Sequence, residues 1–292
     1  MQVPDWQCFM DRFASFGREP GIEKYLDLFD PRGTVKHPGM EKPIAGDEIA
    51  AFISSALANM PDFLLRPTRW CHKHDTLFVE AECSGSVGGR RARWPALYCL
   101  ALRGERVLRG RAYYDRATVL CLADPNLADR RDEAYAMALS EEGLAGEGAG
   151  DAPINESTVE PIFLNAYAAH WQAPVAERFA EFYSDSGKLL VPGTRHALRP
   201  HEVGSYYAAL FRDISDLRQQ SEAWAYRAGL LFVEWRMSGS KNGDSFELGT
   251  ADRITLSEDG RIVEAVSYFD TLALDASEGS RKKRQTVFAG ID

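Results

Sequence analysis

The sequence lacks any apolar run long enough to span a bilayer, which excludes a membrane-spanning helix. Its start, MQVPDWQCFMDRF, carries Asp5 and Asp11 inside the apolar stretch, unlike a secretory signal peptide. All five cysteines precede residue 122 and no C-x-x-C spacing occurs, so we expect reduced, mostly buried thiols rather than a disulfide framework. These absences together predict a cytoplasmic protein.

Outside one segment, the sequence also lacks an excess of either positive or negative charge. The net charge is −9, but residues 122–160 alone hold ten acidic residues and two arginines, so the rest is close to neutral. No basic footprint typical of nucleic-acid binding occurs. With 45% hydrophobic and 26% charged residues, the chain has enough apolar material for a sizeable core. We therefore expect a small-molecule partner, and neither nucleic acid nor a membrane.

The chain contains an internal duplication. FVEAECSG, which starts at Phe78, and FVEWRMSG, which starts at Phe232, match at five of eight positions with an offset of 154 residues. The same offset aligns residues 9–102 without a gap, and one inserted residue then aligns YYD with YFD. The period is far beyond that of solenoid repeats, so each copy is predicted to be a domain. Other matches are Pro38-Gly39 with Pro192-Gly193, Glu48 with Glu202, Asp62 with Asp216, Trp70 with Trp224, Gly89 with Gly243 and Leu102 with Leu256.

The repeat divides the chain into four parts. We expect the two domains at residues 1–121 and 159–277, an acidic Gly/Ala-rich linker at 122–158 and a basic tail at 278–292.

Each copy shows the same order of expected elements. A first helix carries Phe9, Phe13 and Phe16 at helical spacing, with Asp5 as its cap. A short helix, a short strand ending in Pro-Gly, a third helix and four strands follow. Helices followed by a run of strands predict an α+β fold. The later expected elements lie at 21–29, 46–60, 66–72, 76–85, 92–102 and 106–115, and in the second copy at 175–183, 200–214, 222–228, 230–239, 246–256 and 261–270.

This order, with LSEDGRIVEAVSYFDTLAL closing the second copy, resembles the SnoaL-like polyketide cyclases and the ketosteroid isomerases of the nuclear transport factor 2-like superfamily. The resemblance covers nearly the whole chain, once per copy. It implies two tandem cone-shaped domains, each a curved, mostly antiparallel sheet wrapped around helices with an apolar pocket inside. It is strong for the fold and weak for the activity, because this superfamily hosts many functions. It implies no required cofactor and no metal.

The resemblance also points to site residues. Ketosteroid isomerases use a carboxylate base before a proline at the end of the first strand, a tyrosine on the first helix and a protonated aspartate on a later strand. In the first copy these positions hold His37, Phe13 and Tyr98. A histidine can serve as the base, since its ordinary pKa of about 6.5 is near neutrality.

In the second copy the three positions hold Val191, Tyr167 and Asp252, so both donors are present without a base. Neither copy has the full set, and classical ketosteroid isomerisation is therefore not expected in either. The pocket walls are expected to include Trp235, Met237, Phe269, Tyr114 and Phe13.

Each assignment has a plainer alternative. His37 can be a histidine in a surface turn, Tyr98 a core tyrosine, and Asp252 a carboxylate paired with Arg253 or Arg261. His72 and His74 lie on one face of a strand, but their counterparts, Tyr226 and Ala228, do not bind metals.

Three functions remain open. The first is a cofactor-independent isomerase or cyclase that acts on an apolar carbonyl compound of polyketide, steroid or terpenoid type by general acid/base chemistry, with a lyase as a variant. The second is an epoxide hydrolase or epoxide-opening cyclase, although the aspartate position of the limonene type holds Ala112 and Ser267. The third is a non-catalytic ligand-binding or assembly pair. Proton abstraction would need His37 in the first cone, whereas acid-assisted chemistry would use the second cone, which we favour.

The recurring Glu80 and Glu234 alternate away from the expected pockets. We expect the outer sheet faces, with Glu82 and Arg236, to pair the two copies as an intramolecular pseudo-dimer, with a further homodimer as an option.

Overall fold

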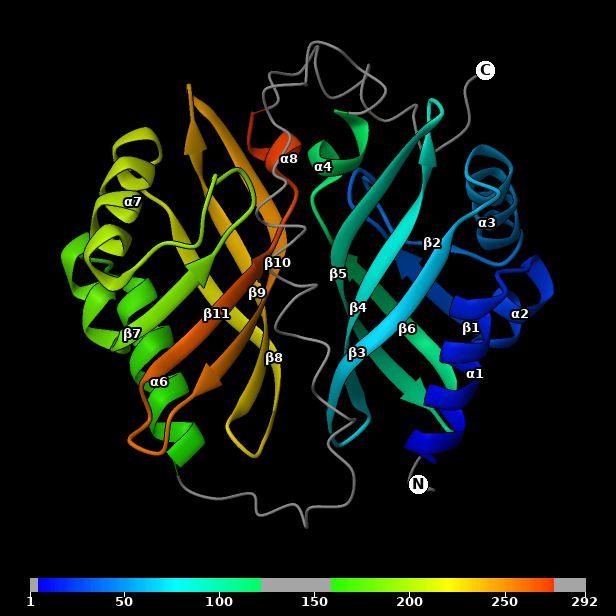
Figure 1. The fold of residues 1–292 in the computed structure, drawn as a ribbon, viewed down its shortest axis with the longest axis horizontal. Coiled ribbons are helices and arrows are strands. Elements are labelled where there is room, and N and C mark those ends of the chain that lie inside the picture. Colours follow the sequence, from blue (N-terminus) through cyan, green and yellow to red (C-terminus); the bar gives the residue numbers. More distant parts are fainter. Residues whose placement is uncertain (1–4, 122–158, 276–292) are drawn as a thin grey trace. The chain divides into compact units, whose positions relative to one another are not determined.

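A computed structural model describes residues 5–121 and 159–275 (Figure 1). The expected linker and most of the basic tail lie outside the described residues. The described residues form two compact units, one of residues 5–121 with 270–275 and one of residues 159–269. Each unit has an α+β fold, as the order of expected helices and strands predicts. In the part of the chain that the structure describes, no helix has the length and apolar character needed to cross a bilayer.

The first helix of the first unit begins where the sequence places its cap. The Asp5 carboxylate accepts a hydrogen bond from the Cys8 amide at 3.0 Å and starts the first helix, whose buried face carries Phe9, Phe13 and Phe16. Figure 1 shows this helix and the two that follow on one side of the sheet. The helices are α1 (Trp6–Arg18), α2 (Ile22–Asp27), α3 (Asp47–Asn59) and α4 (Arg116–Leu120).

The sheet of the first unit has the order β2-β1-β6-β5-β4-β3. All neighbouring strands are antiparallel except β1 and β6, which are parallel. Its inner face and the helices enclose one apolar core, which holds the first-cone site described below. The strands are β1 (Phe29–Lys36), β2 (Ile44–Ala45), β3 (Leu64–Lys73), β4 (Thr76–Val87), β5 (Arg90–Arg103) and β6 (Arg106–Tyr113).

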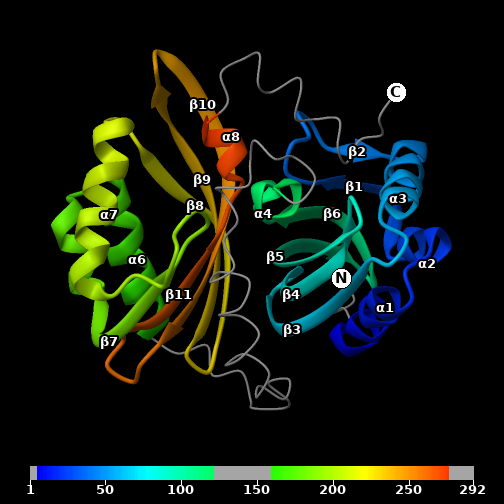
Figure 2. The same ribbon diagram turned by 45° about the horizontal axis from the view of Figure 1, so that its top comes forward.

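The second unit repeats this plan with the strand order β7-β11-β10-β9-β8, in which only the β7–β11 pair is parallel. The turned view shows α6 and α7 on one side of this sheet (Figure 2). The expected second short helix is a 3₁₀ helix, η3. The elements are α6 (Val159–Gln172), η3 (Ala176–Phe182), β7 (Tyr183–Leu190), α7 (Pro200–Asp213), β8 (Arg218–Arg227), β9 (Leu230–Lys241), β10 (Asp244–Leu256) and β11 (Ile262–Tyr268).

Strand alternation sorts the repeated octet into two faces. Val79 and Ala81 belong to the core of the first unit. Glu80 points to the opposite face, where its carboxylate pairs with Arg69 at 2.8 Å. A carboxylate that is 2% exposed needs such a partner, because an unpaired buried charge is strongly unfavourable. In the first unit the octet therefore presents one face to the core and the other face away from it.

One glycine in each copy lets the first strand lie close to the strand that runs parallel to it. A Cβ at Gly33 would lie 2.7 Å from the Val107 carbonyl oxygen, and a Cβ at Gly187 would lie 2.7 Å from that of Ile262. Both glycines occur at register shifts of these strand pairs. They are 154 residues apart, so the duplication preserved this backbone approach in both copies.

The short helix α8 (Thr271–Asp275) belongs to the first compact unit. Leu272 joins the core of that unit, and Asp270 pairs with Arg116 at 2.6 Å. The Asp115 carboxylate caps α4 by accepting a hydrogen bond from the Ala117 amide.

Candidate active site

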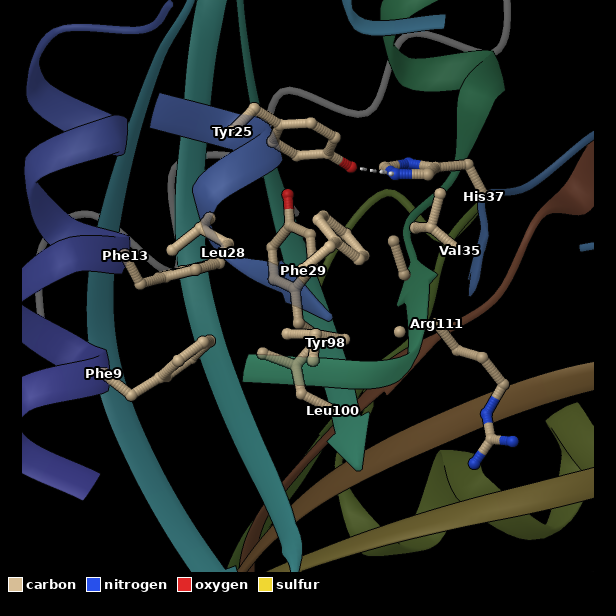
Figure 3. Close-up of a pocket in the computed structure, with 13 residues that line it drawn as sticks. Phe9, Phe13, Tyr25, Leu28, Phe29, Val35, His37, Tyr98, Leu100 and Arg111 are labelled. Carbon is tan, nitrogen blue, oxygen red and sulfur yellow. Dashed lines mark hydrogen bonds between the residues drawn. The ribbon is translucent and has the colours of Figure 1, made fainter. Parts of the chain in front are cut away.

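The first cone contains a small cavity between α1, α2 and the strands β1, β5 and β6. Three of the residues singled out from the sequence, Phe13, His37 and Tyr98, line it (Figure 3). Its volume is about 20 Å³. That is little more than one water molecule needs, so the aromatic side chains of the chain fill most of this interior. Arg111 comes from the same region, but its guanidinium points away from the aromatic side chains in Figure 3.

His37 lies between two tyrosine hydroxyls. Its Nε2 is 3.5 Å from the Tyr25 hydroxyl oxygen, and its Nδ1 is 3.5 Å from that of Tyr114. The imidazole ring also packs on Phe52, with 4.7 Å between ring centroids. Burial lowers the pKa of His37 to about 4, since a charged imidazolium is poorly solvated there. His37 is thus a neutral imidazole at pH 7, and it can accept a proton on one ring nitrogen.

Tyr98 points into the same interior. Its hydroxyl oxygen lies 3.7 Å from the Cys83 sulfur, and its ring meets Phe13 edge-on at 5.5 Å between centroids. Burial raises the pKa of Tyr98 well above its ordinary value, so the hydroxyl stays protonated and can donate a hydrogen bond. The structure therefore brings His37, Tyr98 and Phe13 together around one cavity.

The second cone has a buried carboxyl group. Asp252 lies on β10 opposite Ser267 of β11, on the inner face that Trp235 of β9 shares. Burial raises the pKa of Asp252 to about 6, and the Ser267 and Trp235 side chains offset part of that rise. Arg253 lies on the opposite face of the strand and pairs with Glu264.

The second arginine considered as a partner, Arg261, also binds elsewhere. It pairs with Asp259 and donates to the Tyr183 carbonyl. Neither arginine therefore compensates the buried carboxyl, and desolvation dominates its electrostatics.

The charge of this carboxyl acts on four tyrosines. The Asp252 carboxylate contributes to the raised pKa of each of them, after burial as the main cause. They come from the first helix, the first strand and the third helix of the copy, and their hydroxyls stay protonated. They are Tyr167, Tyr183, Tyr206 and Tyr207.

One of these hydroxyls, that of Tyr183, has spare hydrogen-bonding capacity, whereas the Trp171 and Trp235 indoles already act on Tyr167 and Asp252. The Tyr183 hydroxyl is buried and has no hydrogen-bond partner of normal geometry among the described residues. The Trp235 ring packs against Tyr167, with 5.9 Å between centroids, and its indole is close enough to act on Asp252. A buried donor without a partner is unfavourable, so this interior suits a ligand that supplies an oxygen acceptor.

For the other residues named from the sequence, the structure shows burial or ring packing. Met237 lies two residues beyond Trp235 on the same inner face of β9, and both Met237 and Phe269 are buried. Val191 is buried just after the end of β7. His72 stacks on Trp6, with 4.5 Å between ring centroids. Within residues 5–121 and 159–275, no group of three His, Cys, Asp or Glu side chains is arranged to hold a metal ion.

Sequence reasoning missed most of the tyrosines. In the first copy it overlooked Tyr25. In the second it overlooked three of the four tyrosines around Asp252. The 154-residue offset carried the signal, because four apolar positions of the first copy become tyrosines in the second. These pairs are Phe13 with Tyr167, Phe29 with Tyr183, Phe52 with Tyr206 and Ile53 with Tyr207.

Comparison with protein families finds the SnoaL-like domain twice, at residues 9–110 and 164–265. The two matches lie 155 residues apart at both their starts and their ends, within one residue of the repeat offset. No curated protein is significantly similar to the chain.

Several solved structures are similar to one copy of the chain. A protein of ketosteroid isomerase-like fold from Catenulispora acidiphila, in complex with trimethylamine, is 20% identical, with a TM-score of 0.37 over 41% of this chain and 93% of that one. An NTF2-like protein of unknown function from Burkholderia pseudomallei is 18% identical, with a TM-score of 0.37 over 40% and 95%. A SnoaL-like protein of unknown function from Burkholderia thailandensis is 22% identical, with a TM-score of 0.32 over 38% and 94%.

Proposed function

Since the chain belongs to the SnoaL-like domain family, once in each of its two copies, we propose that it is a small-molecule enzyme. It isomerises or cyclises an apolar carbonyl compound of polyketide, steroid or terpenoid type, and the second cone performs the chemistry. One observation carries the proposal. Asp252 is a buried carboxyl group with a pKa of about 6 on the inner sheet face beside Ser267 and Trp235, and its charge acts on four tyrosines that stay protonated.

In the proposed reaction, the protonated Asp252 donates a hydrogen bond to the carbonyl oxygen of the substrate. Tyr167 donates a second one. Negative charge that develops on this oxygen is then stabilised by donors already in place, in an interior where water does not compete. As the new carbon–carbon bond forms and the carbonyl π bond breaks, Asp252 transfers its proton to the oxygen to give an alcohol, and its carboxylate then takes up the proton that the attacking enol releases.

The cone offers no base at Val191, the position of the ketosteroid isomerase carboxylate. The cone therefore lacks the base of the ketosteroid isomerases at its usual position, and the ionised form of Asp252 is the group left to accept a proton. Ring closure by a nucleophilic carbon of the same substrate needs mainly activation of the carbonyl group. We therefore favour cyclisation over isomerisation for this cone.

The first cone is the weaker candidate. His37 can accept a proton, but its cavity of about 20 Å³ leaves no room for a substrate without rearrangement. We infer that this copy supports the active one, and that His37 would act as a base only if the aromatic side chains around it moved apart. The tandem copies also suit an intramolecular pair, which small-angle scattering of the intact chain would reveal as one compact particle.

The test uses single variants assayed against a panel of unsaturated steroid ketones and linear polyketide-type ketones. Asp252→Asn keeps the size of the side chain but removes the transferable proton, and we expect kcat/KM to fall by ~10²–10⁴-fold. Tyr98→Phe, at the equivalent position of the first copy, is the matched control and should leave turnover unchanged.

His37→Ala decides between the cones. A large loss with His37→Ala and none with Asp252→Asn would move the chemistry to the first cone. Turnover of a substrate by both variants at the wild-type rate would refute both assignments and leave ligand binding as the function.

A further inference from the structure

A groove of about 810 Å³ opens on the first unit, where the C-terminal end of α1 meets β3, β4 and β5. Four arginines and one glutamate line it, so its net charge is +3. Its volume is in the range of small-molecule sites in proteins. The charged residues are Arg18, Arg66, Arg91, Arg93 and Glu82.

Strand pairing places the charged residues of the sheet on its outer face. Arg66 is opposite Glu82 on the neighbouring strand, and Arg93 is opposite Ser84. The core residues Leu65 and Cys83 alternate with them and point the other way. The groove is thus separate from the interior of the cone, and a ligand bound there would replace the expected role of Glu82 in pairing the two copies.

Glu82 holds two of the arginines in place. Its carboxylate lies 3.4 Å from the Arg66 guanidinium and 2.7 Å from that of Arg93. About half of each arginine side chain stays exposed, at 50% and 48%. One carboxylate cannot satisfy ten N–H donors, so each guanidinium keeps donors free for a ligand.

Arg18 and Arg91 have no such partner. Both side chains are exposed, and neither forms an ion pair within the part of the chain that the structure describes. The nearby Asp62 feels the charge of Arg91, but its oxygens already accept hydrogen bonds from Ser86. Glu19, next in the chain to Arg18, likewise feels the charge of that arginine but pairs with Lys24 at 2.8 Å. Two arginines that form no ion pair among the described residues therefore face one groove.

The duplication supplies an internal comparison. At the positions equivalent to the four arginines, the second copy has no arginine. At the position equivalent to Glu82 it has Arg236. The cluster of four arginines is therefore peculiar to the first copy and is not required by the fold. The counterparts of Arg18, Arg66, Arg91 and Arg93 are Gln172, Gln220, Ser245 and Glu247.

The groove also has an apolar part. Leu64 is 42% exposed at its edge, and Ala14 and Pro67 line it as well. An exposed leucine next to free guanidinium groups suits a ligand with an anionic head and an apolar body.

We propose that this groove binds a phosphate ester with an apolar portion. The planar guanidinium fork matches the oxygens of a phosphate, and the net charge of +3 exceeds what one carboxylate would balance. The arginines hold the phosphate, and Leu64 with Pro67 contacts the apolar portion. The site is independent of the chemistry proposed for the second cone.

The experiment is isothermal titration calorimetry of the intact chain with hexyl phosphate, hexanoate and inorganic phosphate. We expect hexyl phosphate to bind with one-to-one stoichiometry and more tightly than the other two. Its affinity should weaken as salt is raised, because the contacts are exposed to solvent.

The decisive variant combines Arg18→Gln with Arg91→Ser, the residues that the second copy carries. We expect it to weaken hexyl phosphate binding tenfold or more. The control combines Arg32→Gln with Arg109→Ser, which removes the same charge from exposed arginines outside the groove. That control should bind hexyl phosphate like the wild type. Leu64→Ser should weaken binding of hexyl phosphate and leave inorganic phosphate unaffected.

Equal loss of affinity in the control and the decisive variant would show a general charge effect and overturn the proposal. Equal affinity for hexanoate and hexyl phosphate would overturn the assignment of a phosphate. Absence of saturable binding would refute the site. Asp252→Asn should bind hexyl phosphate normally, so failure here is distinguishable from failure of the proposed function.

Discussion

Asp62 accepts two hydrogen bonds from Ser86, one from its amide at 2.8 Å and one from its hydroxyl at 2.6 Å. In the second copy, Asp216 accepts from the Ser240 amide at 2.8 Å. Each aspartate follows the third helix of its copy, and each serine ends the strand that contains the repeated octet. The same clamp thus fixes one loop in both copies, although the interiors have diverged.

Removal of this clamp should destabilise either copy. We expect Asp62→Ala and Asp216→Ala to lower the midpoint of thermal unfolding. Hydrogen bonds from the serines lower the pKa of both carboxyls, so their contribution is present above the unfolded-state pKa and lost as pH falls. Calorimetric unfolding between pH 7 and pH 3 measures this. The variants should converge with the wild type at low pH, and a constant difference would contradict the account.

Gly33 and Gly187 should not tolerate a side chain. In each case a Cβ would meet a backbone carbonyl oxygen at 2.7 Å, and a backbone cannot move aside as a flexible side chain can. We expect Gly33→Ala and Gly187→Ala to lower the free energy of unfolding by ~1–3 kcal/mol. Gly21→Ala is the control, because a Cβ there would meet open space. Urea titrations measure all three, and equal stability of the three variants would contradict the prediction.

His37 should make the fold sensitive to mild acid. Its folded-state pKa is about 4, below the ordinary 6.5, so the unfolded chain binds the proton more readily. Stability from this group is present above pH 6.5 and is lost as pH falls towards 4, by on the order of 3 kcal/mol in full. We expect His37→Gln to flatten this pH dependence. The control His201→Gln changes an exposed histidine and should leave it unchanged.

Asp252 should behave in the opposite sense. Its folded-state pKa of about 6 exceeds the ordinary 3.8, so the folded chain binds the proton more readily. Stability is therefore highest below pH 3.8 and falls as pH rises to about 6, by on the order of 3 kcal/mol. We expect Asp252→Asn to be more stable than the wild type at pH 7, while its turnover is lost.

The pH dependence of the same variant tests the chemistry. A reaction that needs the protonated carboxyl should slow as pH rises through about 6. Initial rates from pH 5 to pH 8 measure it. A rate that rises over this range would assign Asp252 the role of a base instead.

The fold could be predicted from the sequence because the same pattern of helices and strands occurs twice in the chain. Two weak patterns at a fixed offset exclude chance better than one, and helix spacing and strand alternation are local properties. The order of elements and the two SnoaL-like domains are confirmed. The 3₁₀ form of η3 was not predicted, since residue spacing alone does not distinguish it from a short α-helix.

The site residues were predicted only at positions that match functional residues of the family that the chain resembles. Tyr167 and Asp252 were named from family positions, and the structure relates them electrostatically. Tyr183 and Tyr206 were missed because they belong to distant segments, and only folding brings their hydroxyls towards one carboxyl. The volume of a cavity depends on how side chains fill it, which no local pattern records. Whether Tyr167 and Asp252 act in catalysis stays a prediction.

The four tyrosines have a consequence for how such a protein can evolve. In a homodimer of identical chains, every substitution appears in both subunits, so a costly polar interior is doubled. Here Tyr167, Tyr183, Tyr206 and Tyr207 have apolar counterparts at the same places in the other copy. Selection could therefore accept the instability of these buried hydroxyls in one half of the chain while the other half kept apolar side chains at the same four places. The two halves of one chain can thus accumulate substitutions independently, while the ratio between them stays fixed at one to one.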